Sequence, residues 1–255
     1  MLDIHCHILP GLDDGAPNYA NSLLMAKQAE AEGIHTIIAT PHHQNGTYIN
    51  DKEDILSRIE ELNNYLQVEN SKVRILPGQE IRIYEKFLND YENGEIMTLA
   101  NHSSYVLIEL PSSHVPAYTN QLFFDIQMKG LTPVISNPER NHEIIDQPDL
   151  LYSLVKNGAA TQISTGSLSG QFGKKIQKFA FDLIDANLAH FVASNAHNAK
   201  KRSFRMLEAF DLIEKKYGTD HIYYFQNNSE IMAKGNHIYR DIPKRTKKKK
   251  IMGLF

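Results

Sequence analysis

The 255-residue chain has one cysteine and no tryptophan. Because a disulfide needs two thiols, Cys6 cannot form one within the chain, and a lone thiol is compatible with a reducing cytosol. No signal peptide opens the sequence, and no apolar run is long enough to span a bilayer. These absences argue against a disulfide-stabilised scaffold and an integral membrane protein, and we expect a cytoplasmic protein.

The chain also lacks an excess of positive charge outside its last residues. Its net charge is −3 at pH 7, although six cations with no acid among them lie near the end, at Lys244, Arg245, Lys247, Lys248, Lys249 and Lys250. Since these six contribute +6, the rest of the chain carries −9. Nucleic-acid binding requires positive surface that displaces counterions, so the acidic body predicts no nucleic-acid partner.

The six cations precede an apolar end, Ile251-Met252-Gly253-Leu254-Phe255. Such a tail, residues 241–255, could hold the protein peripherally at the anionic inner face of a membrane, because each basic residue there contributes about 1 kcal/mol. A disordered solubilising end is the alternative. No low-complexity linker divides residues 1–240, which we interpret as one domain, and the sequence is compatible with an oligomer.

Short apolar segments alternate with segments of helical periodicity. The apolar segments predict strands at the amino terminus and at 35–40, 73–76, 105–111, 132–136, 160–165 and 190–194. The periodic segments predict helices at 21–33, 52–69, 117–130, 149–157, 174–187 and 204–217, whereas 81–99 gives no clear pattern and 222–240 predicts a small outer helix.

Seven strand–helix units imply an α/β protein with parallel strands and right-handed crossovers. Their even distribution along the chain favours a closed barrel. An open doubly wound sheet is the alternative, although no G-x-G-x-x-G motif follows the first strand.

The opening strand carries His5 and His7, which project from the same face because side chains alternate along a strand. A divalent metal ion would satisfy both imidazoles at once, whereas the alternative is one packed and one exposed histidine. Cys6 points to the opposite face and is expected in the core. Because no C-x5-R loop surrounds it, a cysteine nucleophile is not expected.

In parallel α/β folds the functional groups gather at the carboxyl ends of the strands. Here those ends carry His5 and His7, His42, Glu80, Glu109, Asn137 with Arg140, Thr165, and Asn195 with His197. Each residue taken alone could be a helix cap or a solvated loop residue. As a set, imidazoles and carboxylates without thiolates predict a Mn, Fe or Zn site rather than a four-cysteine zinc site.

Two arginines follow these strand ends. Arg140 and Arg202 present the planar fork that fits a phosphate, although either could instead form a surface ion pair. Metal ions beside two arginines indicate hydrolysis of a phosphate ester. Asp13 and Asp14, in the first loop, could orient a ligand or donate a proton, but a turn-forming role is favoured.

Six segments together carry a more specific pattern. They are DIHCHILPGLDDGA at 3–16, IIATPHH at 37–43, LPGQEIRIY at 76–84, the strand that ends at Glu109, NPERN at 137–141 and FVASNAHN at 191–198. With these motifs the sequence resembles the bacterial PHP-domain protein-tyrosine phosphatases of capsule and exopolysaccharide production, over essentially its whole length.

The resemblance implies a distorted TIM-like barrel with up to three metal ions, usually Mn²⁺, at the carboxyl ends of the strands. It also implies hydrolysis of phosphotyrosine on the phosphorylated tail of a membrane-linked bacterial tyrosine kinase, with Arg140 and Arg202 near the phosphate. The ligand positions that it implies are His5, His7, His42, Glu80, Glu109, Asn137, Asn195 and His197.

Two of these positions depart from the family pattern, because Asn137 stands where the family has His and Asn195 where it has Asp. A neutral amide oxygen is a weaker ligand, so we expect at least one weakened metal ion and lowered activity. The alternatives are a non-catalytic phosphotyrosine-binding relative and a phosphatase of small phosphate esters such as histidinol phosphate.

Overall fold

The computed structural model describes residues 1–246, which form nine parallel strands. The strands are β1 (Leu2–Cys6), β2 (Thr36–Ala39), β3 (His42–His43), β4 (Arg74–Pro77), β5 (Glu80–Arg82), β6 (Tyr105–Glu109), β7 (Thr132–Ser136), β8 (Ala160–Ser164) and β9 (Phe191–Ala193). The predicted α/β class with parallel strands is confirmed. Two very short strands, β3 and β5, were not predicted, because polar residues interrupt their apolar pattern.

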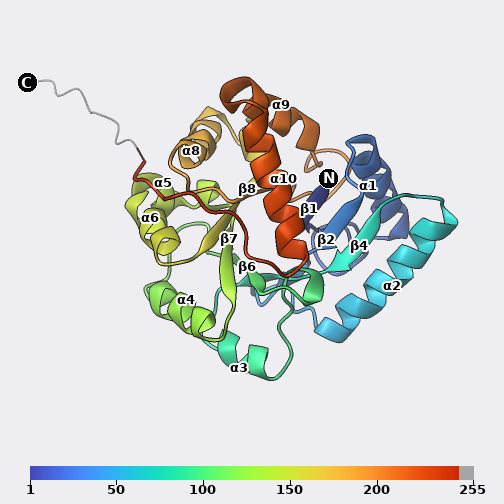
Figure 1. Cartoon of the computed structure of the whole chain (residues 1–255). Helices are drawn as coiled ribbons and strands as arrows, with labels where there is room; N and C mark the ends of the chain where they lie inside the picture. Colours follow the sequence, from blue (N-terminus) through green and yellow to red (C-terminus); the bar gives the residue numbers. More distant parts are fainter. Residues whose placement is uncertain (247–255) are drawn as a thin grey trace, which may run out of the picture.

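The helices surround the strands, as Figure 1 shows. They are α1 (Tyr19–Ala31), α2 (Lys52–Val68), α3 (Phe87–Glu92), α4 (Thr119–Met128), α5 (His142–Asp146), α6 (Asp149–Lys156), α7 (Thr165–Leu168), α8 (Lys174–Asp185), α9 (Met206–Tyr217) and α10 (Thr219–Ala233). Short 3-10 turns at Leu99–Asn101 and Pro138–Arg140 complete the set. The unclear segment 81–99 therefore contains part of β5, α3 and the start of a 3-10 turn.

The strands form two sheets, with the orders β1-β2-β4 and β3-β5-β6-β7-β8-β9. Hydrogen bonds join the sheets beyond β9, where Asn195 N donates to His5 O (2.9 Å) and His7 N donates to Ala196 O (2.8 Å). On the other side, β2 leads within three residues into β3, and β4 leads likewise into β5. These connections support the predicted distorted barrel, in which β2 with β3 and β4 with β5 each continue one bent strand.

Two hydrophobic cores hold this arrangement together. The larger core lies between the strands and the surrounding helices and includes the thiol of Cys6, as expected for a side chain on the outer face of β1. The smaller core is enclosed by strands of both sheets and contains Ile4, Ile38, Leu107, Val134, Phe191 and Met232. Because Met232 belongs to α10, this helix packs against the inner core, and it crosses in front of the strands in Figure 1.

The segment after α10 is fastened to the body of the protein. Tyr105 Oη accepts a hydrogen bond from Ile238 N (3.2 Å), and Lys244 N donates to Ala186 O (2.8 Å). Arg245 pairs with Asp149. The predicted tail, residues 241–255, thus begins on the surface of the body, and its part at 247–255, on which the expected membrane contact depends, lies outside the described residues. None of the helices within residues 1–246 has the length and apolar character needed to cross a membrane.

His190, which directly precedes β9, predicts a loss of stability in acid. Its side chain is 1% exposed, and burial, with a smaller effect of Arg240, lowers the pKa of His190 to about 3. A histidine in an unfolded chain titrates near 6.5. Below that pH the unfolded chain therefore binds a proton at His190, whereas the native protein does not. Between pH 6.5 and pH 5 this group should remove about 2 kcal/mol of stability.

Urea unfolding of the wild-type protein and His190→Gln at pH 7 and pH 5 tests this expectation. The variant should lose less stability on acidification than the wild type, by about 2 kcal/mol. His35→Gln is the matched control because His35 is exposed. Equal acid sensitivity of His190→Gln and the wild type would show that His190 is not responsible.

Candidate metal centre

Glu80 lies at the centre of a group of buried histidines. Its Oε2 atom is 3.3 Å from Nε2 of His5, 3.4 Å from Nε2 of His7 and 3.1 Å from Nδ1 of His42. The other carboxylate oxygen, Oε1, accepts a hydrogen bond from the Ser136 hydroxyl at 2.7 Å. Strands β1, β3, β5 and β7 thus bring these side chains to one end of the sheets.

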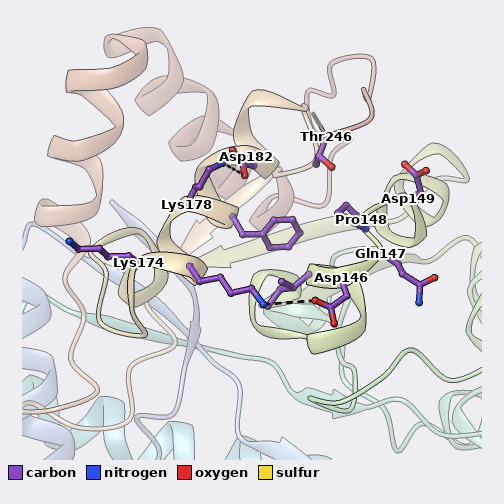
Figure 2. Close-up of a pocket in the computed structure, with 11 residues that line it drawn as sticks. Asp146, Gln147, Pro148, Asp149, Lys174, Lys178, Asp182 and Thr246 are labelled. Atoms are coloured by element: carbon purple, nitrogen blue, oxygen red, sulfur yellow. Dashed lines mark hydrogen bonds and ion pairs between the residues drawn. The ribbon is translucent and has the colours of Figure 1, made fainter. Parts of the chain in front are cut away.

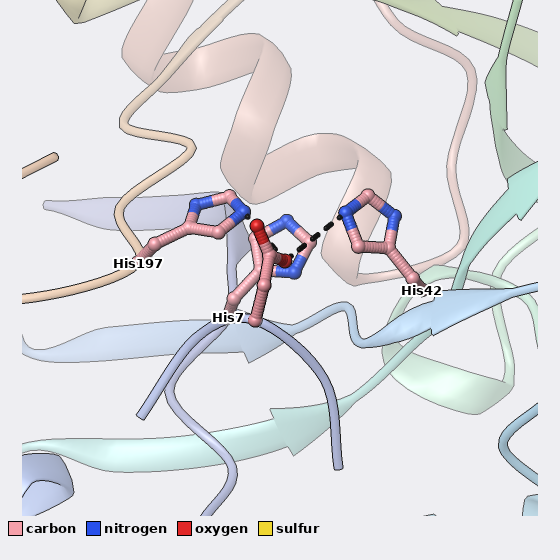
Figure 3. Close-up of side chains that lie close together, drawn as sticks. His7, His42 and His197 are labelled. Atoms are coloured by element: carbon pink, nitrogen blue, oxygen red, sulfur yellow. Dashed lines mark ion pairs between the residues drawn. The ribbon is translucent and has the colours of Figure 1, made fainter. Parts of the chain in front are cut away.

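Asp14 gathers a second group at the same end. Its Oδ1 atom is 3.5 Å from Nε2 of His42 and 3.4 Å from Nε2 of His197, and its Oδ2 accepts a hydrogen bond from Arg202 at 2.9 Å. The ring of His197 stacks on that of His7, with 3.7 Å between the ring centres. Figure 3 shows His7, His42 and His197 turned toward one another.

Glu109 completes a third group with two residues already described. Its Oε2 atom is 3.7 Å from Nδ1 of His42. The guanidinium of Arg82, on β5, also reaches Glu109 Oε2 at 3.1 Å. Parallel pairing explains this proximity, because Arg82 lies beside Glu109 in the register of β5 and β6.

Polar neighbours orient the imidazoles. Nδ1 of His5 is 2.8 Å from Oε1 of Gln162, and Nδ1 of His7 is 2.6 Å from Oδ2 of Asp13. Nδ1 of His197 is 3.0 Å from the carbonyl oxygen of Asn195. In each case a hydrogen bond at Nδ1 leaves Nε2 facing the cluster, which is the arrangement of a metal-binding histidine.

Asn137 and Asn195 share an unusual backbone conformation. Their φ angles are 47° and 48°, in the left-handed region that Asn adopts more readily than most residues. The Oδ1 atoms of both are buried and have no hydrogen-bond partner within residues 1–246. Asn137 follows Ser136, the residue that donates to Glu80, and Asn195 lines a small cavity with Arg140 and Arg202.

The donor set fits divalent metal ions. Three groups have ligand atoms that all lie within 4.8 Å of one another, and they are His5, His7 and Glu80; His7, Asp14, His42 and His197; and His42, Glu80 and Glu109. Nδ1 of His42, Nε2 of His197 and Oε2 of Glu109 are buried and have ion-pair contacts but no hydrogen-bond partner within the described part of the chain. Buried polar atoms are normally satisfied, so this concentration of unsatisfied nitrogen and oxygen atoms indicates a site for cations.

Electrostatics supports the same conclusion. Burial alone would lower the pKa of His7, but the carboxylates of Asp13 and Glu80 outweigh it and raise that pKa to about 10. Burial, with the nearby charge of Glu80, raises the pKa of Glu109 to about 7. Burial, with the charge of His7, lowers the pKa of His197 to about 3. The carboxylates therefore attract positive charge strongly, and a neutral His197 keeps a lone pair for a metal ion.

The two arginines lie beside this cluster. Arg202 is 35% exposed and is bound to Asp14, whereas Arg140 has no carboxylate partner among the described residues. The guanidinium of Arg140 instead lies over the ring of Phe172, with its carbon 5.0 Å from the ring centre. Both arginines line the same small cavity, so they can bind one anion together.

The structure adds residues that the sequence did not assign to the site. The predicted turn-forming role of Asp13 and Asp14 is incomplete, because Asp13 orients His7 and Asp14 joins a candidate metal group. The neighbouring side chains of His197 and His42 hold the pKa of Asp14 far below its usual range, so Asp14 is ionised and is not a proton donor at neutral pH. Thr165, although at a predicted strand end, donates to Phe204 O and is not one of the ligand groups.

A large cavity lies elsewhere. It measures about 910 Å³ and is bounded by α5, the start of α6, α8 and Thr246 (Figure 2). Two of its lysines pair with acids of the same lining, since Lys178 Nζ is 2.6 Å from Asp182 and Lys175 Nζ is 3.8 Å from Asp146. The cavity holds none of the predicted site residues, and the chemistry is assigned to the histidine–carboxylate cluster.

Fold and site together define a parallel α/β protein with a histidine–carboxylate centre that suits divalent metal ions and is flanked by arginines. Residues 1–233 match the family model for capsular polysaccharide synthesis proteins, CpsB/CapC. The chain belongs to this family.

Several relatives are similar over most of their length. Tyrosine-protein phosphatase YwqE of Bacillus subtilis is 48% identical over 255 residues, which is 100% of both chains. The putative tyrosine-protein phosphatase CapC of Staphylococcus aureus is 39% identical over 255 residues and also 100% of both chains. Tyrosine-protein phosphatase CpsB of Streptococcus pneumoniae is 32% identical over 86% of this chain and 91% of its own length.

Solved structures agree with these similarities. Among crystal structures of YwqE from Bacillus subtilis and CpsB from Streptococcus pneumoniae, described as metal-dependent tyrosine phosphatases, one chain superposes with a TM-score of 0.95. It is 48% identical, and the match covers 97% of this chain and 100% of that chain. An organophosphorus hydrolase mutant matches with a TM-score of 0.52 at 12% identity over 92% of each chain, which shows a shared fold alone.

Proposed function

We propose that this protein is a metal-dependent protein-tyrosine phosphatase of the capsule synthesis type. The observation that carries the proposal is the position of Arg202, which binds the carboxylate that also contacts His42 and His197. A phosphate held by Arg140 and Arg202 would therefore lie next to the candidate metal groups. The relatives named tyrosine-protein phosphatase support phosphotyrosine as the substrate.

We infer that up to three ions bind, with Mn²⁺ first and Fe or Zn as alternatives, because nitrogen and carboxylate ligands without thiolates suit these metals. Asp14 joins the ligand set through its position between two histidines. Because Asn137 and Asn195 are neutral ligands, we expect at least one metal ion to be bound more weakly. The proposed ligands predicted from the sequence are His5, His7, His42, Glu80, Glu109, Asn137, Asn195 and His197.

Metal ions bound here would stabilise negative charge on the phosphoryl group and lower the pKa of a nearby water. Residues of the chain bind and orient the substrate. Arg140 and Arg202 bind the phosphate oxygens and orient the phosphorus for attack by water, which breaks the bond to the tyrosine oxygen. Asp14 keeps the guanidinium of Arg202 beside the cluster, and Asp13 and Gln162 fix the rings of His7 and His5.

We further propose that the substrate is the phosphorylated tail of a bacterial tyrosine kinase and that the reaction takes place in the cytoplasm, near the inner face of the membrane. The family assignment to capsular polysaccharide synthesis supports this setting. Residues 1–240 would form the phosphatase domain and residues 241–255 a basic tail. Because the body of the chain is acidic, we expect no nucleic-acid partner.

The test is phosphate release by the full-length chain after chelator treatment and reloading with Mn²⁺. We expect manganese-stimulated hydrolysis of a phosphotyrosine peptide, faster than hydrolysis of histidinol phosphate. No release at any metal concentration would contradict the proposal, and faster hydrolysis of histidinol phosphate would favour a small-ester phosphatase.

Asn137→His combined with Asn195→Asp refines this test. Because the variant replaces two weak ligands, we expect its metal affinity to rise by about tenfold or more, measured as metal ions per chain by elemental analysis. If the wild type bound the peptide without turnover and the variant hydrolysed it, the wild-type chain would be a non-catalytic phosphotyrosine binder.

A further inference from the structure

One loop contacts both arginine-bearing segments. It joins α7 to α8 and contains Gln171 and Phe172. The ring of Phe172 lies against the guanidinium of Arg140 at 5.0 Å, and Nε2 of Gln171 donates to the carbonyl oxygen of Lys201 at 2.5 Å. Since Lys201 directly precedes Arg202, two adjacent side chains of this loop connect to the two segments that would bind phosphate.

The space between the arginines is small. The cavity that Arg140 and Arg202 line with Gln171 and Phe172 measures about 10 Å³. A single water needs about 10–15 Å³, so a phosphate group cannot enter without a displacement of the lining. The oxygen Oδ1 of Asn195, which also lines this cavity, is buried without a hydrogen-bond partner in residues 1–246. The cavity therefore brings two cationic groups together in a space that is too small for a phosphate group.

Glycines allow the loop to lie this close and to move. A Cβ atom on Gly166 would be 2.7 Å from Oε1 of Gln171 and 3.0 Å from the ring of Phe172, so any larger residue would push both side chains away. Gly170 and Gly173 flank the pair with φ angles of 82° and 93°, which other residues rarely adopt. A glycine on each side lets Gln171 and Phe172 shift together.

We propose that Gln171 and Phe172 are positioning residues for phosphate binding, which hold the guanidinium groups of Arg140 and Arg202 beside the same cavity and move as a pair to admit phosphate. Phe172 acts through Arg140, because its ring restricts the guanidinium without reaching the candidate metal groups. Gln171 acts through the backbone that leads to Arg202. This inference rests on the proposed phosphatase function and concerns the same site.

The first test compares Phe172→Ala and Phe172→Tyr in the Mn²⁺-loaded full-length chain. Phe172→Ala should raise Kd for inorganic phosphate and KM for a phosphotyrosine peptide by about tenfold, with kcat changed less than KM. Phe172→Tyr keeps a ring over Arg140 and should stay within about twofold of the wild type. Phe124→Ala is the matched control, because Phe124 is 58% exposed on α4. Unchanged phosphate affinity in Phe172→Ala would overturn the proposal.

A double-mutant cycle separates positioning from a general structural role. If Phe172 acts through Arg140, adding Phe172→Ala to Arg140→Ala should not weaken phosphate binding further. A further weakening as large as in the wild-type background would refute the inference. Failure of the phosphatase function itself would look different, because phosphate binding would still depend on Phe172 while the peptide was not hydrolysed.

Discussion

Glu80→Gln is expected to lower kcat/KM for a phosphotyrosine peptide by at least about 100-fold and to reduce the number of bound metal ions. One oxygen of Glu80 lies within 3.4 Å of His5, His7 and His42. Glu80 also belongs to two of the three candidate metal groups. Gln keeps the size of the side chain but removes its charge, so the loss would come from the missing carboxylate rather than from packing.

The measurement combines metal analysis of the purified variant with steady-state kinetics at saturating Mn²⁺. Glu60→Gln is a suitable control, because Glu60 is exposed on α2 and its substitution makes the same chemical change. Circular dichroism should show that Glu80→Gln is folded. Retention of the full metal content and of wild-type activity in Glu80→Gln would remove Glu80 from the metal centre.

Much of the fold and part of the candidate site could be predicted from local patterns in the sequence. His5, His42 and Glu80 each lie at the end of a short apolar segment or just beyond it, and parallel strands bring such ends to one edge. The structure brings these three side chains together, with Glu80 Oε2 3.3 Å from His5 and 3.1 Å from His42. The number of strand–helix units and the order of the candidate ligand residues along the chain were therefore predictable.

The remaining features depend on tertiary pairing that no local pattern records. Strand β5 contains three residues, and its conformation is set by the register in which Glu80 lies beside Leu107 and beside His42 of β3. The contact of Phe172 with Arg140 also joins segments from different loops. The sequence around Phe172 predicts only a loop between a strand and a helix, because no local pattern indicates the contact with Arg140.

Asp14 shows most clearly why part of the site could not be predicted. The Asp13-Asp14-Gly15 sequence is typical of a turn, which is sufficient to explain both acids locally. Asp14 nevertheless binds Arg202, which lies 188 residues further along the chain. Only the closing of β9 beside β1 brings Arg202 and His197 to the first loop. One residue can therefore be both a turn former and a metal ligand, and its role as a ligand can be recognised only in the folded chain.

Asp14→Asn is expected to lower kcat/KM by about 10–100-fold and to remove about one metal ion per chain. The substitution removes the carboxylate that lies 3.5 Å from His42 and 3.4 Å from His197, and it releases Arg202 from its ion pair. Because His5, His7 and Glu80 form a group without Asp14, the remaining metal should stay bound. We therefore expect KM to rise together with the fall in kcat, since phosphate binding and metal content are both impaired.

Elemental analysis and kinetics of Asp14→Asn beside Asp211→Asn test this expectation, since Asp211 is exposed on α9 and far along the chain from the first loop. The control should retain the metal content and the kinetics of the wild type. If Asp14→Asn lost activity but kept every metal ion, Asp14 would act only through Arg202. If metal content and activity were both unchanged, the acid would be a turn residue, as its local sequence suggests.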